Sequence, residues 1–446
     1  MNARTQYRAK VVSPEAAVRS VKSGDWVDYN FCLSQPVVLD AALAARKDEL
    51  FGVRVRGGMR MGSFKIIEAD ATGEHFSYST WHTTGFERKL MDEGIITHTP
   101  MVYRNKPLFY RKSLEVDVAM FCVSPMDDEG YFNCSFTNSA TRAIVEKAKT
   151  VILEVNEKFP AFPNGYEHKI HISEIDYVVE GENPDMAVIP PAPSTETDRL
   201  IASLIIPRIR DGATIQLGIG ALPNAIGSMI IESDLKNLGM HTEMLVDAYM
   251  AMFEAGKITN THKGIDKGVG MFTFCAGSAA LYDWTRANKD RLATGAVNYT
   301  NNPAVIAQNP NMVTVNSCVE VDVLGQVTSE TSGKRQISGS GGQLDFINGG
   351  YLSEGGQSFV CCTSTYKDKS GKAHSRIRLS LPQYSAVTDP RTEMHCLVTE
   401  WGVADLAGRS IWERAERIIN VAHPDFREEL FRGAEELGFW KRSRKK

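Results

Sequence analysis

The sequence QLGIGALP at residues 216–223 decides how this chain folds. An apolar segment of strand length ends at Gly218, and Gly220 follows in the turn. Pro223 suits the first position of a helix because its φ is already close to the helical value, so we expect a helix that begins there. A buried strand, a glycine turn and a helix in this order are typical of α/β proteins, in which parallel strands alternate with helices.

The glycine turn itself has two interpretations, and the pattern favours neither. Two glycines let the backbone approach a ligand closely, and the free N–H groups at a helix start attract phosphate, carboxylate or an oxyanion. The same residues also make a tight turn that binds nothing. Proline stands where a dinucleotide-binding fingerprint has its third glycine, and no clear ribose-binding acid follows, which disfavours a nicotinamide cofactor.

A lone carboxylate, Glu243, follows where the next strand is expected, with apolar Met244 and Leu245 beside it. Ligands collect at the carboxyl ends of parallel strands, so the turn and this segment can belong to one site. A poorly solvated carboxylate can act as a nucleophile or a base. The alternative is a partly exposed glutamate at a strand edge. His241 and Asp247 are near in sequence, but without a third partner they do not indicate a catalytic triad.

Length and charge narrow the class of protein. A chain of 446 residues is too long for one ordinary core, so two domains are expected. A formal net charge of -4 gives no reason to expect nucleic acid as a partner. No apolar run reaches the length of a signal peptide or a membrane span, so we expect a cytoplasmic protein with no membrane partner.

The cysteines and histidines give no sign of a metal site. The eight cysteines are scattered and form no Cys-x-x-Cys pair, which indicates neither a zinc site nor a disulfide framework and is consistent with a reducing cytoplasm. His168 and His171 lie three positions apart, but no carboxylate or further histidine completes a ligand set. We expect these two side chains to be surface histidines.

The proline-rich segment 182–195 places a domain boundary near residue 190. The predicted domains are 1–190 and 191–446. Both begin with a helix, a basic-x-Gly turn, a buried strand, a loop and a helix that starts with proline, which suggests two related α/β domains. Apolar runs of strand length at 119–123, 150–155 and 314–319 favour mainly parallel sheets.

Three further segments are candidates for ligand binding. The sequence SGSGGQLDF at 338–346 is typical of a loop that wraps a ligand or passes close to another backbone. It is not a Gly-x-Ser-x-Gly elbow, so Ser340 is not expected to be a hydrolase nucleophile. The glycine-rich segment 56–62 is interpreted as structural or substrate-lining. Residues 367–372 are interpreted as a charged hairpin tip or, alternatively, as a positive patch that binds ligand phosphates.

Taken together, these motifs resemble the acetyl-CoA hydrolase/transferase family of class I coenzyme A-transferases. The resemblance covers nearly the whole chain and rests on five blocks in order: GIGALPNA at 218–225, GMHTEM at 239–244, GSGGQLDF at 339–346, VTEWGVADL at 398–406 and AHPDFREEL at 422–430. It implies two open α/β domains of the CoA-transferase type with mainly parallel sheets. The C-terminal domain would carry the catalytic glutamate and the CoA-binding loops.

The resemblance also implies a mechanism and a set of site residues. Glu243 would be the nucleophile of a ping-pong reaction that passes through a glutamyl-CoA thioester. The implied CoA-binding residues belong to two glycine loops and one hairpin, and they are Gly218, Ile219, Gly220, Ala221, Leu222, Gly341, Gly342 and Lys367. No metal and no tightly bound cofactor is implied, since coenzyme A is itself a substrate.

The preferred substrates are the least defined part of the prediction. Within the family, segments in residues 81–107 resemble the enzymes that exchange CoA between butyryl-CoA and acetate, which implies these substrates. The alternatives are transfer to 4-hydroxybutyrate, an acetyl-CoA hydrolase on the same scaffold and, more distantly, a nicotinamide-dependent oxidoreductase. The expected partners are therefore acyl-CoA esters and short-chain carboxylates, with a homodimer or homotetramer expected from the family.

Overall fold

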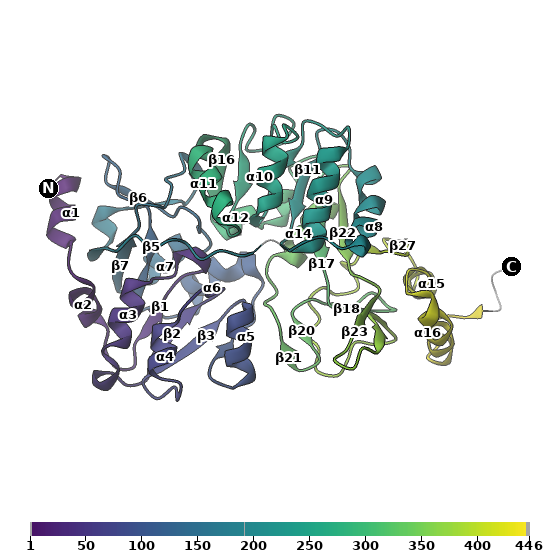
Figure 1. Ribbon diagram of the computed structural model, residues 1–446, viewed down its shortest axis with the longest axis horizontal. Coiled ribbons are helices and arrows are strands. Elements are labelled where there is room, and N and C mark those ends of the chain that lie inside the picture. The colour runs from purple at the N-terminus through teal and green to yellow at the C-terminus, as the bar shows by residue number, and fades with distance from the viewer. Residues whose placement is uncertain (1, 191, 443–446) are drawn as a thin grey trace. The chain divides into compact units, whose positions relative to one another are not determined.

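The computed structural model describes residues 2–190 and 192–442 (Figure 1). Its chain divides into two compact units. Unit 1 comprises Met1–Pro190, Glu243–Leu245 and Val269–Asn301, and unit 2 comprises Pro191–Thr242, Val246–Gly268 and Asn302–Lys446. Glu243 therefore belongs to the same compact unit as the N-terminal part of the chain. The division into domains 1–190 and 191–446 stays a prediction.

Unit 1 contains a seven-stranded sheet in which every strand pair is parallel. In spatial order its strands are β10 (Tyr177–Glu180), β7 (Thr150–Val155), β5 (Val118–Val123), β1 (Trp26–Asp28), β2 (Val53–Gly57), β3 (Phe76–Thr80) and β4 (Thr97–His98). The strands predicted at 119–123 and 150–155 are confirmed as β5 and β7. All six residues of β5 are buried, as expected for a strand covered on both faces.

The core of unit 1 lies on both sides of this sheet. Successive side chains of β5 point to opposite faces, because Met120 belongs to one buried cluster and Phe121 to the other. The helices of the unit are α1 (Ala3–Lys10), α2 (Pro14–Ala17), α3 (Val38–Ala44), α4 (Lys65–Ala69), α5 (Gly85–Asp92), α6 (Lys106–Lys112), α7 (Thr141–Lys147), α11 (Ala279–Ala287) and α12 (Val297–Thr300), and its 3-10 helices are η1 (Val18–Ser20), η2 (Cys32–Ser34), η3 (Lys47–Glu49), η4 (Tyr103–Asn105), η5 (Ile172–Glu174) and η7 (Lys289–Arg291).

Three smaller sheets complete unit 1. A parallel sheet has the order β14 (Gly270–Phe272), β16 (Leu292–Gly295) and β8 (Asn164–Tyr166). β6 (Tyr131–Asn133) pairs antiparallel with β9 (Lys169–His171). β13 (Met244–Leu245) pairs in parallel with β15 (Phe274–Cys275), and this pairing attaches the Glu243 segment to unit 1.

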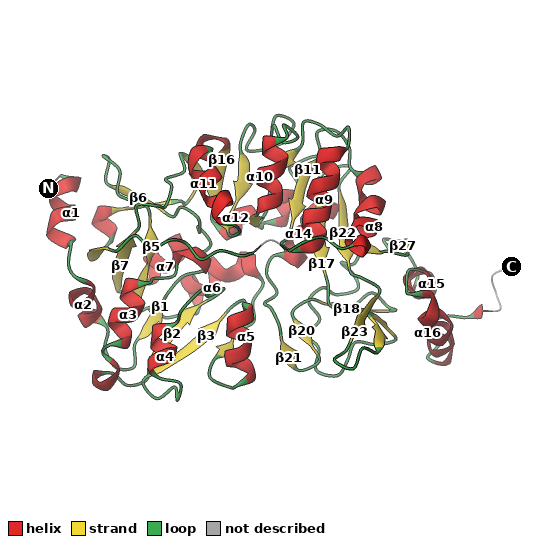
Figure 2. Cartoon of the chain, viewed as in Figure 1, coloured by secondary structure: helices red, strands yellow, loops and turns green. Residues whose placement is uncertain are grey.

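Unit 2 is built on a six-stranded sheet with the order β12 (Gly239–Met240), β11 (Thr214–Leu217), β17 (Val313–Ser317), β22 (Gln357–Cys361), β26 (Cys396–Thr399) and β27 (Gly402–Asp405). Only the last pair of this sheet is antiparallel. The strand predicted at 314–319 is confirmed as β17. The mixed α/β fold with mainly parallel sheets, which the sequence predicts, is confirmed; Figure 2 shows helices and strands interleaved along the chain.

The helices of unit 2 are α8 (Glu196–Ile205), η6 (Ile206–Arg208), α9 (Ala221–Glu232), α10 (Asp247–Glu254), α13 (Pro303–Ile306), α14 (Gln343–Leu352), α15 (Ile411–Asn420) and α16 (Pro424–Glu436). Its remaining strands are β18 (Glu320–Asp322), β19 (Val327–Thr328), β20 (Thr331–Ser332), β21 (Arg335–Gln336), β23 (Thr365–Lys367), β24 (Ala373–Ser375) and β25 (Ile377–Arg378). β23 and β24 pair antiparallel on either side of residues 368–372, so the hairpin predicted there is confirmed.

The helix predicted to begin at Pro223 begins instead at Ala221. Gly220 occupies the N-cap position with φ 121°, a backbone conformation open to glycine, so the helix starts directly after the turn. Pro223 lies in the first turn, where no backbone N–H has an intrahelical partner to lose. The prediction was wrong because proline is tolerated throughout the first turn and does not mark its first residue.

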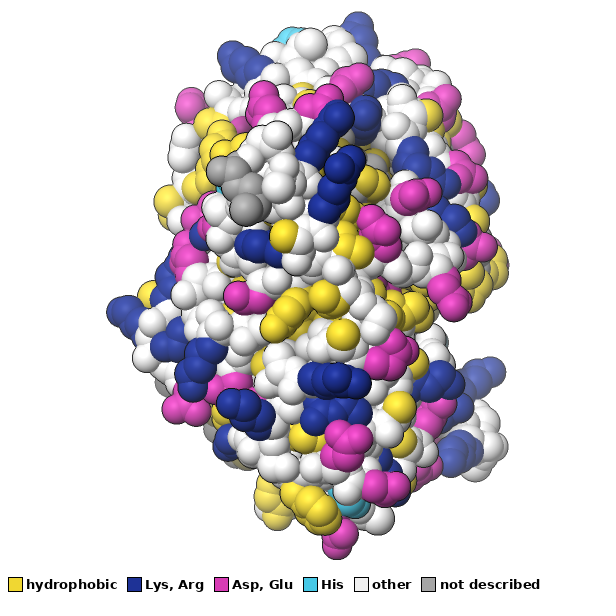
Figure 3. Space-filling view, turned by 90° about the vertical axis from the view of Figure 1, so that its left-hand side faces the viewer, with side chains coloured by type: hydrophobic (Ala, Val, Ile, Leu, Met, Phe, Trp, Pro, Cys, Tyr) yellow, Lys and Arg dark blue, Asp and Glu magenta, His cyan; other side chains and the backbone are white. Residues whose placement is uncertain are grey.

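No helix among the described residues is both long and apolar enough to cross a membrane. On the face of the molecule shown in Figure 3, basic and acidic side chains are interspersed and do not gather by sign. The eight cysteines all lie in the described part of the chain and are free thiols.

Candidate active site

Glu243 lies in the short segment between β12 and β13, three residues beyond Met240 at the end of β12. Its backbone carbonyl accepts hydrogen bonds from the N–H groups of Thr273 and Phe274, at 3.0 and 3.1 Å. These bonds fix the backbone on the neighbouring strand of unit 1. The side chain is partly exposed, while Met244 and Leu245 after it are buried. The carboxylate is thus placed at the edge of an apolar layer.

Asn301 holds this carboxylate. Its Nδ2 donates a hydrogen bond to Oε2 of Glu243 at 2.6 Å. Asn301 is fully buried and follows α12 as its C-cap, where its own N–H donates to the carbonyl of Val297 at 2.9 Å. A short bond from a fixed amide orients the carboxylate and stabilises its negative charge. No sequence motif marks Asn301, which lies 58 residues from Glu243.

Three aromatic rings pack beside the Glu243 segment. Phe31 meets Phe274 edge to face with ring centres 5.1 Å apart, and Tyr103 lies 5.3 Å from Phe31 and 6.4 Å from Phe274. Burial, and after it the charge of Glu243, raises the pKa of Tyr103 well above its usual range. The phenol therefore stays protonated and can donate a hydrogen bond, which it gives to Oγ of Ser139 at 2.8 Å.

The predicted anion-binding turn, Gly218 to Leu222, joins β11 to α9 in unit 2. A Cβ built on Gly218 or Gly220 would meet no atom within 4 Å, so open space lies over the backbone there. The N-cap of α9 makes no side-chain hydrogen bond with the first turn. Ile219 is 48% exposed. An uncapped helix start with open space in front of it suits an anionic ligand.

The second glycine loop precedes α14 in the same unit. Gly341 has φ 55°, in the left-handed region, and Gly342 is the N-cap of α14. Two side chains hold the loop: Ser340 donates to Glu330 at 2.9 Å, and Gln343 donates to Asp389 at 2.5 Å. Burial raises the pKa of Asp389 to about 7. The predicted site residues of unit 2 thus come from the starts of two helices, with the exposed Lys367 on a third element, β23.

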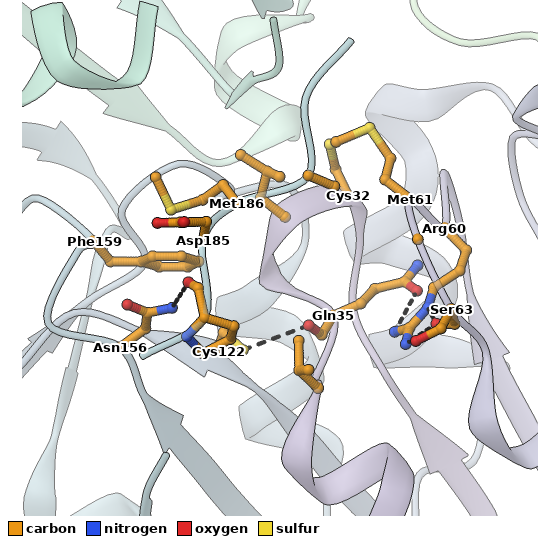
Figure 4. Close-up of a pocket in the computed structure, with 15 residues that line it drawn as sticks. Cys32, Gln35, Arg60, Met61, Ser63, Cys122, Asn156, Phe159, Asp185 and Met186 are labelled. Carbon is orange, nitrogen blue, oxygen red and sulfur yellow. Dashed lines mark hydrogen bonds between the residues drawn. The ribbon is translucent and has the colours of Figure 1, made fainter. Parts of the chain in front are cut away.

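Unit 1 also contains a pocket of about 190 Å³ that the sequence analysis did not single out. Figure 4 shows Gln35 between Cys122 and Arg60, where its side chain accepts from Arg60 at 3.3 Å and its backbone carbonyl accepts from the Cys122 thiol at 3.4 Å. Met61, from the glycine-rich segment interpreted as structural or substrate-lining, is part of its wall. Arg60 forms an ion pair with buried Asp40 at 2.9 Å, so the charge of Arg60 is neutralised within the fold.

His168 and His171 lie in different surroundings. His171 caps η5 and accepts from the N–H of Ser173. Burial lowers the pKa of His168 to about 4. Across the described residues no three His, Cys, Asp or Glu side chains are grouped so that they could hold a metal ion.

Comparison with known proteins relates this geometry to a family. A model of the acetyl-CoA hydrolase/transferase N-terminal domain matches residues 1–190, and a model of the C-terminal domain matches residues 277–434. A butyryl-CoA:acetate CoA-transferase of Anaerostipes caccae is 46% identical, covering 100% of both chains. A 4-hydroxybutyrate coenzyme A transferase of Clostridium kluyveri is 39% identical, covering 95% of this chain and 97% of that one. The crystal structure of RipA from Yersinia pestis has a TM-score of 0.89 and 33% identity, covering 98% of this chain and 100% of that one.

Proposed function

Because this chain belongs to the acetyl-CoA hydrolase/transferase family, we propose that it transfers coenzyme A between butyryl-CoA and acetate. The observation that carries the proposal is Glu243, a carboxylate fixed at both its backbone and its side chain and bound by Asn301 at 2.6 Å. The full-length likeness to a butyryl-CoA:acetate CoA-transferase supports this pair of substrates. Coenzyme A is a substrate of the reaction, and the chemistry needs no metal.

In the first half-reaction a carboxylate oxygen of Glu243 attacks the carbonyl carbon of butyryl-CoA. The C–S bond breaks, CoA thiolate leaves, and a mixed anhydride of glutamate and butyrate remains. The thiolate then attacks the glutamyl carbonyl carbon, the bond from that carbon to the butyrate oxygen breaks, and butyrate departs. Glu243 is left as a glutamyl-CoA thioester.

The second half-reaction reverses this order with acetate. An acetate oxygen attacks the thioester carbon of Glu243, and CoA thiolate leaves again to give a glutamyl-acetyl anhydride. The thiolate attacks the acetyl carbon, so acetyl-CoA forms and Glu243 recovers its carboxylate. No proton is consumed in either half, since each attacking group and each leaving group is an anion.

Two sets of hydrogen-bond donors suit the charge that develops on oxygen. Asn301 is an uncharged donor on Glu243, so it can stay bound while that oxygen changes from carboxylate to tetrahedral oxyanion. We assign the N–H groups of the turn from Gly218 to Leu222 to the CoA ester or to its oxyanion. We assign the backbone of Gly341 and Gly342 to the pantetheine arm and Lys367 to a phosphate.

Intact-protein mass spectrometry tests the proposal directly. After incubation with butyryl-CoA and no acceptor, the protein should gain the mass of CoA less one water, and peptide mapping should place the adduct on Glu243. Glu243→Gln keeps the size of the side chain but removes the nucleophile, and it should remain unmodified and lose activity by roughly 10⁴-fold or more. A wild-type protein that turns over without an adduct would rule out the covalent mechanism.

Two related activities are distinguished by the acceptor. A hydrolase on the same scaffold would release CoA steadily with no carboxylate added, whereas a transferase would stop after one turnover. The likeness to a 4-hydroxybutyrate coenzyme A transferase supports 4-hydroxybutyrate as the second candidate for the acceptor. An assay in which 4-hydroxybutyrate and acetate compete for the same loaded enzyme shows which acceptor is preferred. We also propose that the protein is cytoplasmic and forms a homodimer or homotetramer. Light scattering measures its oligomeric state.

A further inference from the structure

Lys106, the first residue of α6, is a fully buried cation close to the Glu243 segment. Its ammonium nitrogen lies 4.9 Å from the ring centre of Phe31, 5.8 Å from that of Tyr103 and 5.9 Å from that of Trp81. It also donates a hydrogen bond to Oγ of Ser139 at 3.3 Å. Aromatic faces carry partial negative charge and stabilise a cation that has lost its water. The cage therefore holds a positive charge inside unit 1.

The same cage borders the Glu243 segment. Phe31, whose face carries the ammonium group, packs edge to face on Phe274 at 5.1 Å, and the N–H of Phe274 donates to the carbonyl of Glu243 at 3.1 Å. Tyr103, the second wall of the cage, is within the field of the Glu243 carboxylate, which raises the pKa of its phenol. Two walls of the cage thus lie near the segment that carries the proposed nucleophile.

Ser139 joins the cation to the residues that hold the carboxylate. Its hydroxyl oxygen receives hydrogen bonds from both Lys106 and Tyr103, at 3.3 and 2.8 Å. Its N–H donates to Oγ1 of Thr273 at 3.1 Å, one residue before Phe274. Its carbonyl accepts from the N–H of Val297 at 2.8 Å, at the start of the helix that ends in Asn301. The position of the ammonium group is therefore fixed relative to Glu243.

Burial lowers the pKa of Lys106, and the charged groups that act on it are Asp28, which raises that pKa, and Arg56, which lowers it. Buried Arg56 and Asp28 lie 3.8 Å apart and offset each other. Lys106 then contributes one positive charge to the cage, whose wall Tyr103 lies in the field of the Glu243 carboxylate. Conversion of Glu243 to a neutral thioester removes that negative charge, while Lys106 keeps its positive charge. Buried charges are poorly screened, so the field at the thioester favours an anion.

We propose that Lys106 directs the glutamyl-CoA thioester toward a carboxylate acceptor and away from water. The inference rests on the proposed function, since it concerns the second half-reaction. Acetate arrives as an anion, is attracted by the uncompensated cation, and attacks the thioester carbon as CoA thiolate leaves. Water is neutral, gains little from the same field, and must also lose a proton when it attacks. Lys106 acts through its charge and determines acceptor specificity without touching the reacting atoms.

The test measures how the isolated thioester divides between acetate and water. Protein loaded with butyryl-CoA is freed from excess butyryl-CoA and from the released butyrate and is mixed with acetate at several concentrations, and the acetyl-CoA formed is compared with free CoA. Lys106→Met removes the charge and keeps an unbranched side chain. We expect it to lower the second-order rate constant for acetate by on the order of tenfold and to leave hydrolysis within about threefold of wild type. Lys106→Arg should retain most of the preference for acetate.

Control variants separate the effect of losing the Lys106 charge from an effect on folding. Lys263 is also fully buried, and burial lowers its pKa to about 8 as it does for Lys106, but it belongs to unit 2. Lys263→Met should leave the division between acetate and water unchanged. Thermal unfolding identifies variants that are folded, with Lys106→Gln as a second neutral variant. If neither neutral variant folds, the rate constant of the wild-type thioester with acetate is measured instead as the pH rises through about 8, where Lys106 loses its charge.

The outcomes of this test are distinct. A folded neutral variant, or wild type above pH 8, that reacts with acetate at the original rate overturns the inference. An equal effect in Lys263→Met also overturns it, because a general loss of stability would then explain the change. If wild type forms no adduct at all, the proposed nucleophile is wrong, and that result is seen before any acceptor is added.

Discussion

At the scale of single residues, the bond between Asn301 and Glu243 is the contact on which the proposed chemistry most depends. Hydrogen bonds to a charged group contribute about 1.5 to 3 kcal/mol. Asn301→Ala removes the bond of 2.6 Å that orients the carboxylate. We expect the rate of adduct formation with butyryl-CoA to fall by roughly 10 to 100-fold. Rapid mixing followed by mass spectrometry measures this rate.

The adjacent Asn302 provides a matched control. Its side chain caps α13 by accepting from the N–H of Ala304 at 3.0 Å. Asn302→Ala should therefore cost about 1 kcal/mol of stability through the lost cap and leave the rate of adduct formation close to wild type. If both alanine variants slow the reaction equally, the effect is one of local packing and Asn301 has no role of its own in holding the carboxylate.

The reaction with acetate should also depend on pH through Lys106. Burial lowers the pKa of this lysine from 10.5 to about 8, while the charge of Asp28 raises it and that of Arg56 lowers it. The phenols of Tyr103, a wall of the cage, and of Tyr110, four residues on in α6, have pKa values raised by burial and remain neutral in this range. Lys106 is thus charged below pH 8 and neutral above it.

The rate constant for acetate should accordingly decline as the pH rises from 7 to 9, whereas adduct formation should not follow this midpoint. Stopped-flow measurements on the loaded protein give both rates. In Lys106→Arg the decline should disappear, because a guanidinium group keeps its charge throughout this range. A decline that persists in the arginine variant would assign the titration to another group.

At the scale of elements, the start of α9 depends on Gly220. Its φ of 121° and ψ of -171° are accessible almost only to glycine, and the space around it is open, so any cost of substitution comes from the backbone. Gly220→Ala should destabilise the protein by about 1 to 3 kcal/mol or shift the turn. We expect KM for butyryl-CoA to rise more than tenfold, because a shifted turn misplaces the N–H groups at the helix start.

Gly256→Ala is the control for this prediction. Gly256 follows α10, has φ 71° and is equally open, so alanine there is strained without clashing with a neighbour. Gly256→Ala should lower the melting temperature of the protein and leave KM for butyryl-CoA unchanged. Equal changes of KM in the two variants would mean that the turn from Gly218 to Leu222 has no specific part in binding.

The sequence predicts those elements whose signal is local. β5 and β7 are apolar runs of strand length, and α2 begins at Pro14 after a serine that caps it, so each could be identified from neighbouring residues. The start of α9 was missed by two residues, because proline fits every position of the first turn. Strand order could not be predicted, since pairing depends on residues far apart in the chain.

The residues of the candidate site also differ in whether the local sequence predicts them. Glu243 and the glycine turns stand out because each is a short pattern, and the family resemblance gives them roles. Asn301 carries no such pattern, because an asparagine in a turn is ordinary in any sequence. Tyr103 and Lys106 lie within the segments at 81–107 that resemble the butyryl-CoA:acetate enzymes, but that resemblance gives neither residue a role. They gain meaning only where the fold brings them near the Glu243 segment, 58 residues from Asn301.

At the scale of the whole molecule, unit 1 is assembled from three separate stretches of chain. Phe136 and Phe162, from the first stretch, pack against Tyr282 and Phe272 of the third, each pair with ring centres 5.3 Å apart. β8 pairs with β16, and the Glu243 segment is attached by β15. The proposed nucleophile is therefore held by parts of the chain that fold together but lie more than a hundred residues apart.

This connectivity predicts the behaviour of the first 190 residues expressed alone. The fragment lacks β14, β15 and β16, so the buried rings of Phe136 and Phe162 lose the rings they pack against. We expect a broad thermal transition and binding of a dye that recognises exposed apolar surface. Joining residues 269–301 to the fragment through a flexible linker should sharpen the transition, because it restores the missing strands. A sharp transition and no dye binding in residues 1–190 alone would instead mean that the N-terminal domain folds as one continuous piece.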